Sequence, residues 1–342
     1  MKHIIGAISA DPVNPIPAGE ISRSAQVTSL LVDEDSAGQR LDNFLMWHLK
    51  GVPKTHVYRI IRSGEVRVNK GRVQADTRVQ TGDVVRLPPV RISEKVAEKI
   101  EKPAPAREFP ILFEDEHLLA IDKPAGVAVH GGSGVSFGVI EQLRRARPQA
   151  KFLELVHRLD RETSGILLIA KKRSALTHLQ AQFRERETGK TYLALVQGAW
   201  PSNKKVIDSP LHKYLLDGPP GTEGVGERRV KVVGKDDPNG MRAITLVKLA
   251  PVPPQKSYEG TLLEVTIKTG RTHQIRVHLA SLGHPIAGDD KYGDFEWNKA
   301  LQKRGLKRMF LHAWCLTFHH PADSRVVPLR VDLPPELQGW LA

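Results

Sequence analysis

A proline-dense segment divides this 342-residue chain into two regions of different pattern. Residues 88–110 contain five prolines spaced among charged residues. Proline fixes φ and lacks an amide donor, so the segment suits a semi-rigid linker better than the interior of a helix or sheet. We therefore expect domains over residues 32–90 and 109–342, joined by a linker over 91–108 and preceded by a flexible tail over 1–31.

The smaller region concentrates the positive charge of the chain. Apolar residues recur at helical spacing from Leu41 to Leu49, and alternation at Val66 and Val68 predicts a strand. Residues 40–91 hold 11 Lys and Arg against four Asp and Glu, which supplies +7 of the total net charge of +13. Such a focused basic patch favours a polyanionic partner, RNA or DNA before an anionic membrane.

The composition excludes several classes of protein. With 40% hydrophobic and 26% charged residues, the chain has the composition of a globular protein. Its one cysteine, Cys315, excludes an intramolecular disulfide and a cysteine-cluster zinc site. No apolar run approaches the roughly 18 residues of a membrane span, and Asp11 and Pro12 interrupt the apolar stretch near the N-terminus before a signal peptide forms. We expect a reduced, cytoplasmic protein.

The larger region alternates candidate strands and helices. Hydrophobic patterning predicts strands at five places: 118–121, 165–170, 192–197, 262–267 and 310–318. Helical spacing predicts three helices: 137–147, 174–187 and 274–281. Residues 217–240 are rich in glycine, proline and charge, so we expect a long surface hairpin loop there.

The densest polar cluster outside the basic patch is the loop over residues 156–165, which leads into an apolar strand. Its one aspartate, Asp160, lies between Arg158 and Arg161. Nearby cations keep a carboxylate ionised, which favours a nucleophile over a general acid. An aspartate that forms ion pairs with its own arginines on a surface loop has the same pattern, so spacing alone leaves both interpretations open.

A second cluster, residues 268–278, places Arg271 and Arg276 near the start of a predicted helix that Thr272 is suited to cap. Basic side chains at a helix N-terminus favour an anion, although a solvated basic helix start gives the same pattern. The histidines at 273, 278 and 284 are five and six residues apart, which places no pair on one helix face and argues against a metal site. Tyr192, alone on a strand, is typical of the edge of a core.

The order of several motifs resembles that of the RluA-type pseudouridine synthases, which isomerise uridine within RNA. The resemblance rests on residues 157–165 and on four further motifs in the family's order: 122–126, 190–194, 269–276 and 310–313. Residues 38–90 resemble an S4 RNA-binding domain. Residues 129–134 and 138–141 further resemble a member of the family that acts on large-subunit ribosomal RNA.

The resemblance implies an α+β fold, with a mixed, mainly antiparallel sheet in the catalytic domain behind a small S4-like α/β domain. It implies cleavage of the N1–C1′ bond of uridine and rejoining through C5, with no cofactor and no metal. Asp160 matches the nucleophile, whether it attacks C1′ or C6, and Arg271 matches the arginine that pairs with it. Tyr192 matches the residue that stacks on the extruded uracil and helps to remove the C5 proton, and Arg158 matches the residue that fills the vacated base stack.

RNA contacts are expected from both domains, because phosphate recognition depends on basic side chains. We expect them at Arg158, Arg161, Arg59, Arg62, Arg67, Lys70 and Arg276. The expected partner is large-subunit (23S) ribosomal RNA, and the expected state is a monomer, because no heptad pattern or large apolar stripe is present. Two alternatives stay open: a synthase that acts on transfer RNA or other ribosomal uridines, and a non-catalytic RNA-binding factor in ribosome assembly.

Overall fold

The computed structural model describes six stretches of the chain: residues 27–49, 52–90, 104–131, 137–216, 227–250 and 260–341. The chain divides into two compact units, residues 1–103 and 104–342, and each is described by itself. Most of the expected tail and linker, residues 1–26 and 91–103, lies outside the described residues. No described helix is long and apolar enough to cross a membrane.

The end of the expected tail is a strand instead. Residues Thr28–Leu31 form β1, which pairs antiparallel with β4 (Val84–Leu87). The expectation of a tail as far as residue 31 was therefore wrong for these four residues. Leu30 packs against the core of the unit, and the backbone groups of the strand gain partners in β4, so the short segment is held at the sheet edge.

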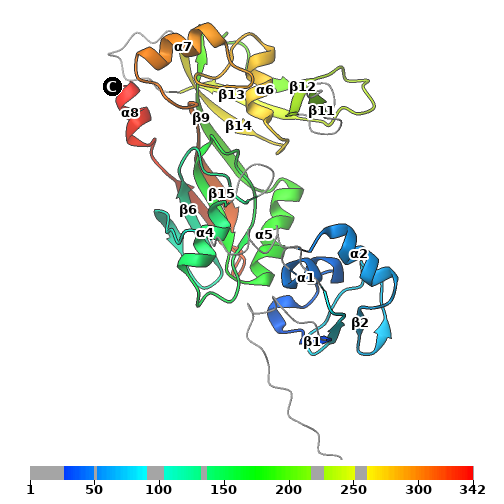
Figure 1. The fold of residues 1–342 in the computed structure, drawn as a ribbon. Helices are drawn as coiled ribbons and strands as arrows, with labels where there is room; N and C mark the ends of the chain where they lie inside the picture. The colour runs from blue at the N-terminus through cyan, green and yellow to red at the C-terminus, as the bar shows by residue number, and fades with distance from the viewer. Residues whose placement is uncertain are drawn as a thin grey trace, which may run out of the picture. The chain divides into compact units, whose positions relative to one another are not determined.

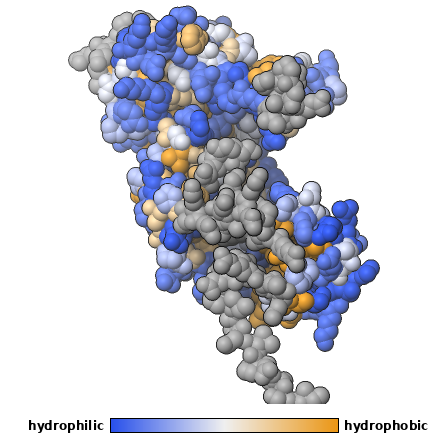
Figure 2. Space-filling model, in the orientation of Figure 1, coloured by the Kyte–Doolittle hydropathy of each residue, from blue (hydrophilic) through white to orange (hydrophobic). Residues whose placement is uncertain are grey.

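In its described residues, the N-terminal unit combines a four-stranded sheet, ordered β1-β4-β2-β3, with two α-helices. Its remaining elements are η1 (Glu34–Ser36), α1 (Leu41–His48), α2 (Lys54–Arg62), β2 (Arg67–Val68) and β3 (Gly71–Arg72). The apolar positions at helical spacing turn inward, and Phe44 and Ile60 are almost fully buried. Burying this face leaves the basic side chains on the outside. Figure 2 shows hydrophilic residues along the outer edge of this unit.

The C-terminal unit is built on a ten-stranded sheet (Figure 1). Its strands are β5 (Ile111–Glu114), β6 (Leu118–Lys123), β7 (Glu154–Leu155), β8 (Ser164–Ala170), β9 (Gly189–Gln197), β10 (Val206–Asp208), β13 (Ile244–Leu249), β14 (Gly260–Ile267), β15 (Leu311–His319) and β16 (Val326–Arg330). Among the described strands of this sheet, only β8 and β15 pair in parallel. The prediction of a mixed, mainly antiparallel sheet is confirmed.

Five helices in the described part of this unit accompany the sheet: α4 (Val139–Ala146), α5 (Arg173–Glu185), α6 (Gln274–Ser281), α7 (Phe295–Lys303) and α8 (Pro335–Leu341). In Figure 1, α4 and α5 lie toward one end of the unit, and α6 and α7 lie toward the other. The expected surface loop over 217–240 contains a strand, because β12 (Glu227–Val232) pairs with β11 (Leu211–Leu216) as a hairpin. Residues 217–226 of that loop lie outside the described residues.

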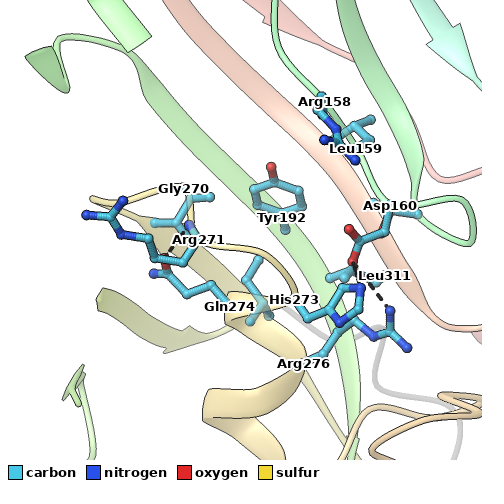
Figure 3. A pocket seen from close by; sticks show the side chains of 13 residues that line it. Arg158, Leu159, Asp160, Tyr192, Gly270, Arg271, His273, Gln274, Arg276 and Leu311 are labelled. Carbon is cyan, nitrogen blue, oxygen red and sulfur yellow. Dashed lines mark hydrogen bonds and ion pairs between the residues drawn. The ribbon is translucent and has the colours of Figure 1, made fainter. Parts of the chain in front are cut away.

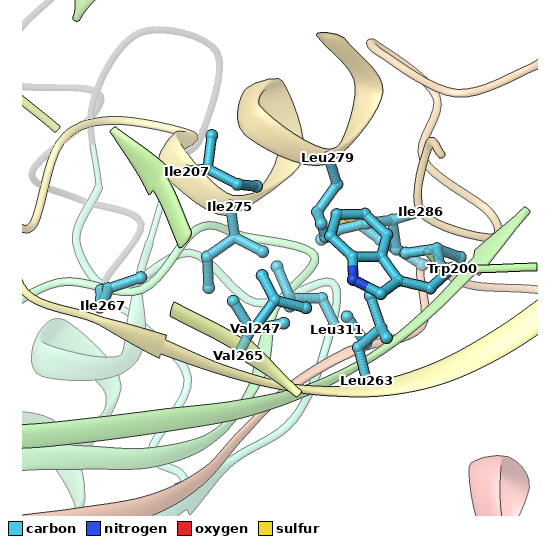
Figure 4. Packing of buried hydrophobic residues seen from close by; sticks show 13 residues of the cluster. Trp200, Ile207, Val247, Leu263, Val265, Ile267, Ile275, Leu279, Ile286 and Leu311 are labelled. Atoms are coloured by element: carbon cyan, nitrogen blue, oxygen red, sulfur yellow. The ribbon is translucent and has the colours of Figure 1, made fainter. Parts of the chain in front are cut away.

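Helix α6 is anchored on the sheet by apolar packing. Ile275 and Leu279 lie one turn apart on the helix and contact a buried cluster that includes Val265 and Trp200 (Figure 4). Residues four apart share one helix face, so both side chains point into the same core. Because α6 is held in this way, the residues at its start have fixed positions above β9 and β14.

Candidate active site

A pocket in the C-terminal unit gathers side chains that are far apart in the sequence. The loop between β7 and β8 contributes Arg158 and Asp160, and β9 contributes Tyr192. The start of α6 and the segment before it contribute His273 and Arg276. Figure 3 shows the Asp160 carboxylate and the Tyr192 ring beside the same space. The two clusters recognised in the sequence therefore meet in one site.

The loop that carries Asp160 is fixed by a buried lysine. Lys123, at the end of β6, donates from Nζ to the carbonyl oxygens of Pro124 (2.9 Å), Val127 (2.8 Å) and Arg161 (3.1 Å). These bonds use all three protons of the charged ammonium group, although burial lowers its pKa to about 7. Arg161 follows Asp160 directly, so Lys123 holds the backbone beside the carboxylate.

The loop enters β8 through a glycine that approaches β15 closely. Gly165 has φ +110°, and a Cβ there would lie 2.3 Å from the carbonyl oxygen of Ala313. Only glycine fits a position with both constraints. One turn earlier, the Thr163 amide donates to the Asp160 carbonyl oxygen at 3.1 Å. The tight turn and the close approach together fix the position of the Asp160 loop relative to β8.

The Asp160 side chain uses one of its two oxygens for contacts. Oδ2 lies 3.4 Å from Arg276 Nη1 and 3.9 Å from His273 Nε2. Oδ1 has no hydrogen-bond or ion-pair partner among the described residues. The side chain is 29% exposed, so Oδ1 can be reached from the pocket. The carboxylate is thus paired on one side and open on the other.

Arg276 is held in place by a buried ion pair with Asp289. Its Nε and Nη2 each donate at 2.7 Å to the two carboxylate oxygens of Asp289, which is 1% exposed. Burial alone would raise the pKa of Asp289, but the hydrogen bonds and charge of Arg276 hold it below its usual range. A two-point contact of this kind fixes the plane of the guanidinium group, so Nη1 points to Asp160 with little freedom.

The geometry corrects the sequence prediction for the arginine that pairs with Asp160. Arg271 does not pair with Asp160; its Nε donates to the Arg242 carbonyl oxygen at 3.2 Å, and Figure 3 shows its guanidinium turned away from the carboxylate. Arg276 takes that contact, because it lies in the first turn of α6 on the face toward Asp160. Arg276 is 3% exposed and lines the pocket, so its role as an RNA contact stays a prediction that is limited to a nucleotide entering the pocket.

Tyr192 lies on the central strand β9 and lines the same pocket as Asp160. Burial raises the pKa of its hydroxyl well above 10, and the nearby charge of Asp160 adds to the effect. The phenol therefore keeps its proton at neutral pH. A protonated phenol does not accept a proton, which favours a stacking role for Tyr192 over the removal of a proton from C5.

The other predicted RNA contacts lie in two separate places. Arg158 and Arg161 are exposed on the site loop, and Arg161 forms a 2.6 Å ion pair with Glu162. In the N-terminal unit the remaining predicted contacts are Arg59, Arg62, Arg67 and Lys70. Of these four, Arg67 is only partly exposed and donates to the Gly64 carbonyl oxygen at 2.8 Å, which ties it to its own turn.

Three residues of the site were not singled out as site residues from the sequence. Asp289 holds Arg276, Tyr292 contacts the ring of His273, and His273 faces Asp160. His273 lies in the basic cluster over residues 268–278, but the sequence assigns it no role at Asp160. A pair of aspartates after Gly288 is the one local signal at Asp289, and nothing in its spacing relates it to Asp160.

Among the residues that the structure describes, no group of three or more His, Cys, Asp or Glu side chains is placed to hold a metal ion.

His157, next to Arg158, makes the site loop sensitive to acid. Its ring stacks on Phe183 at 4.6 Å, its Nε2 accepts from the Leu168 amide at 3.1 Å, and burial lowers its pKa to about 3. Between pH 6.5 and 3 the unfolded chain binds a proton that the folded chain does not, so stability is lost as the pH falls. The slope approaches about 1.4 kcal/mol per pH unit.

Urea unfolding at several pH values measures this dependence. The His157→Gln variant removes the titrating ring and keeps an acceptor for the amide, so the free energy of unfolding is expected to fall less steeply between pH 6.5 and 4 than in the wild type. Equal slopes in the two proteins would contradict the prediction.

Comparison with known proteins gives consistent matches to both units. Residues 117–281 match the family of RNA pseudouridylate synthases, and residues 39–85 match the S4 domain. The chain is 50% identical over 320 residues to the ribosomal large subunit pseudouridine synthase C of Pasteurella multocida (strain Pm70), which covers 92% of this chain and 93% of that protein. It is 49% identical over 322 residues to the protein of the same name from Haemophilus influenzae, with 93% and 95% covered.

A solved structure is also similar. The human protein RNA pseudouridylate synthase domain containing 4 superposes with a TM-score of 0.51 and 28% identity. The similarity covers 66% of this chain and 89% of that chain.

Proposed function

This chain belongs to the RNA pseudouridylate synthase family, and from that premise we propose that it isomerises uridines of large-subunit ribosomal RNA through Asp160. The names of its relatives support this choice of RNA. The observation that best supports the role of Asp160 is its pairing: Arg276 and His273 face Oδ2, and Oδ1 opens into the pocket beside Tyr192.

The reaction needs little beyond what this pocket holds. The N1–C1′ bond breaks, a C5–C1′ bond forms, the proton of C5 leaves and N1 gains a proton, so atoms and electrons balance without a redox partner. An ionised carboxylate can form and release a covalent bond to the sugar or the base. Arg276, itself fixed by Asp289, faces Oδ2 of this carboxylate and orients it.

The uracil must leave its base stack to reach Asp160, which costs a few kcal/mol. The flat ring of Tyr192 offers the extruded base a surface to stack on. Arg158, exposed at the rim of the pocket, is placed to occupy the position that the base has left, since a guanidinium group both stacks and contacts phosphate. In this proposal Asp160 is the nucleophile, Tyr192 stacks on the extruded uracil, and Arg158 replaces that base in the RNA stack.

The N-terminal unit supplies phosphate contacts in this proposal. Replacing Arg59, Arg62 and Lys70 together by alanine is expected to weaken RNA binding and to flatten its salt dependence. Each lost phosphate contact lowers the log–log slope by about 0.7–0.9. Affinity for ribosomal RNA measured from 50 to 300 mM salt, roughly the range over which such contacts are resolved, gives the slope.

A matched control removes the same charge elsewhere. Lys299, Lys303 and Lys307 are exposed in or just after α7, and their alanine variant is expected to keep the wild-type slope. An equal loss of slope in both triple variants would mean that net charge, rather than the N-terminal patch, sets the salt dependence.

Tritium release tests the proposed function directly. Large-subunit ribosomal RNA that lacks its own modifications, labelled at C5 of uridine, is the substrate, because isomerisation liberates that hydrogen. We expect release by the wild-type protein from this RNA and none from transfer RNA labelled in the same way. Release from transfer RNA alone would overturn the choice of RNA. If no tritium were released from ribosomal RNA, from transfer RNA or from a subunit precursor, a non-catalytic binding factor would be favoured.

A further inference from the structure

Two side chains converge on the same oxygen of the nucleophile. His273 Nε2 lies 3.9 Å from Asp160 Oδ2, the oxygen that also faces Arg276 Nη1 at 3.4 Å. The two residues lie three positions apart, with His273 at the N-cap of α6 and Arg276 in its first turn. Figure 3 shows both on the side of the carboxylate away from Tyr192. The contacts of the carboxylate are therefore one-sided.

The His273 ring is held from its other side by Tyr292. The tyrosine oxygen lies 2.8 Å from His273 Nδ1 and accepts a hydrogen bond of 3.0 Å from the Val230 amide on β12. An amide only donates, so the arrangement that gives every proton a partner has the hydroxyl donating to Nδ1. A neutral ring then carries its own proton on Nε2, the nitrogen that faces Asp160.

The backbone of His273 supports a fixed place for this ring. Its φ of 52° and ψ of 21° lie in the left-handed region, which is uncommon for a residue other than glycine. As N-cap of α6, its side chain makes no capping hydrogen bond. A neighbouring side chain bonds the backbone here: the Gln274 side-chain oxygen accepts a hydrogen bond from the Arg271 amide at 3.1 Å. The unfavourable backbone conformation therefore gives the helix no side-chain capping hydrogen bond, but it directs the His273 ring to Asp160.

We propose that His273, oriented by Tyr292, is a positioning residue for uridine isomerisation: it keeps Oδ2 of Asp160 turned toward Arg276 so that Oδ1 alone meets the substrate. The inference rests on the proposed function, since it assigns a task at the same carboxylate. Arg276 by itself offers one contact, about which the carboxylate can still rotate. A second group on the same side removes that rotation, and a misplacement of about 1 Å in a reacting group costs on the order of 100-fold in rate.

Single-turnover kinetics of two variants test the role of the ring. His273→Ala is expected to lower the rate of the chemical step 10- to 100-fold, with the concentration of RNA at half-saturation within about threefold of wild type. His273→Gln keeps one acceptor and one donor in similar places, so it is expected to recover most of the rate. A wild-type rate in the alanine variant, or a glutamine variant as slow as alanine, would overturn the proposal.

A double-mutant cycle separates positioning from general loosening of the site. Tyr292→Phe removes only the hydroxyl and is expected to slow the chemical step by a smaller factor than His273→Ala. Because Tyr292 acts through His273, the double variant is expected to be no slower than His273→Ala alone. Losses that multiply in the double variant would show that the two side chains act independently, against the proposal.

The tautomer of His273 gives a measurement that needs no RNA. In the full-length protein with ¹⁵N-labelled histidine, imidazole ¹⁵N–¹H correlation spectra are expected to show the proton of His273 on Nε2, and this preference is expected to weaken in Tyr292→Phe. A proton on Nδ1 would overturn the inference even if the enzyme isomerises ribosomal RNA. An inactive wild type with the Nε2 tautomer would instead count against the proposed function.

Discussion

Asp160→Asn is expected to lose all measurable tritium release from ribosomal RNA, a fall of at least about 10³-fold, because an amide cannot form the bond to the substrate that a carboxylate forms. RNA affinity is expected to stay within a few-fold of wild type. The cations that contact phosphates contribute most of the binding free energy, and Asp160 is a single side chain with only one oxygen open to the pocket.

The control for this variant is a neighbouring carboxylate. Asp290 is 65% exposed and lies 3.5 Å from Arg276 Nη2, so Asp290→Asn removes one negative charge beside the same arginine. Its rate is expected to stay within a few-fold of wild type. Residual turnover in Asp160→Asn above the background without enzyme would refute the assignment of the nucleophile.

The second large effect is expected at Arg276. Arg276→Met leaves the carboxylate of Asp289 buried without its ion-pair partner. Removing one member of a buried pair costs about 3–5 kcal/mol of stability. Turnover is expected to fall as well, because Asp160 loses the guanidinium group that faces Oδ2. Urea unfolding and tritium release on the same preparation measure the two effects.

A compensating variant separates stability from catalysis at this position. When Asp289→Leu is combined with Arg276→Met, the unpaired charge is gone, and part of the lost stability is expected to return. Turnover is expected to stay low, since Asp160 still lacks its arginine. Arg271→Met is the matched single control, with stability close to wild type. If Arg271→Met lost turnover and Arg276→Met kept it, the pairing seen at Asp160 would not matter for the reaction.

Much of the architecture around the site follows from local patterns. The predicted helix over 274–281 has the observed bounds of α6, and the strand expected over 165–170 lies within β8. Both segments have apolar residues at the spacing of their element and a glycine near one boundary, and such signals act within a few residues. Residues 28–31 lacked a signal of this strength, because β1 is short and only half-buried.

The choice between Arg271 and Arg276 could not follow from the sequence. Both arginines lie in one short motif, and either could face an anion near the start of a helix. The left-handed backbone at His273 and the ion pair with Asp289 decide which one turns inward. Asp289 lies 13 positions after Arg276, and its approach depends on how the following loop packs, which no periodicity records.

The parallel pairing of β8 with β15 has a consequence for synthesis on the ribosome. Ser164, four residues after Asp160, lies beside His312 in the neighbouring strand, 148 positions later. Contacts at such separation form late, because the intervening chain must first be closed into a loop. A growing polypeptide that ends before residue 311 lacks the strand against which Gly165 packs. We therefore expect the nascent chain to remain inactive until residues 311–319 have left the exit tunnel, so that catalytic competence is acquired together with β15.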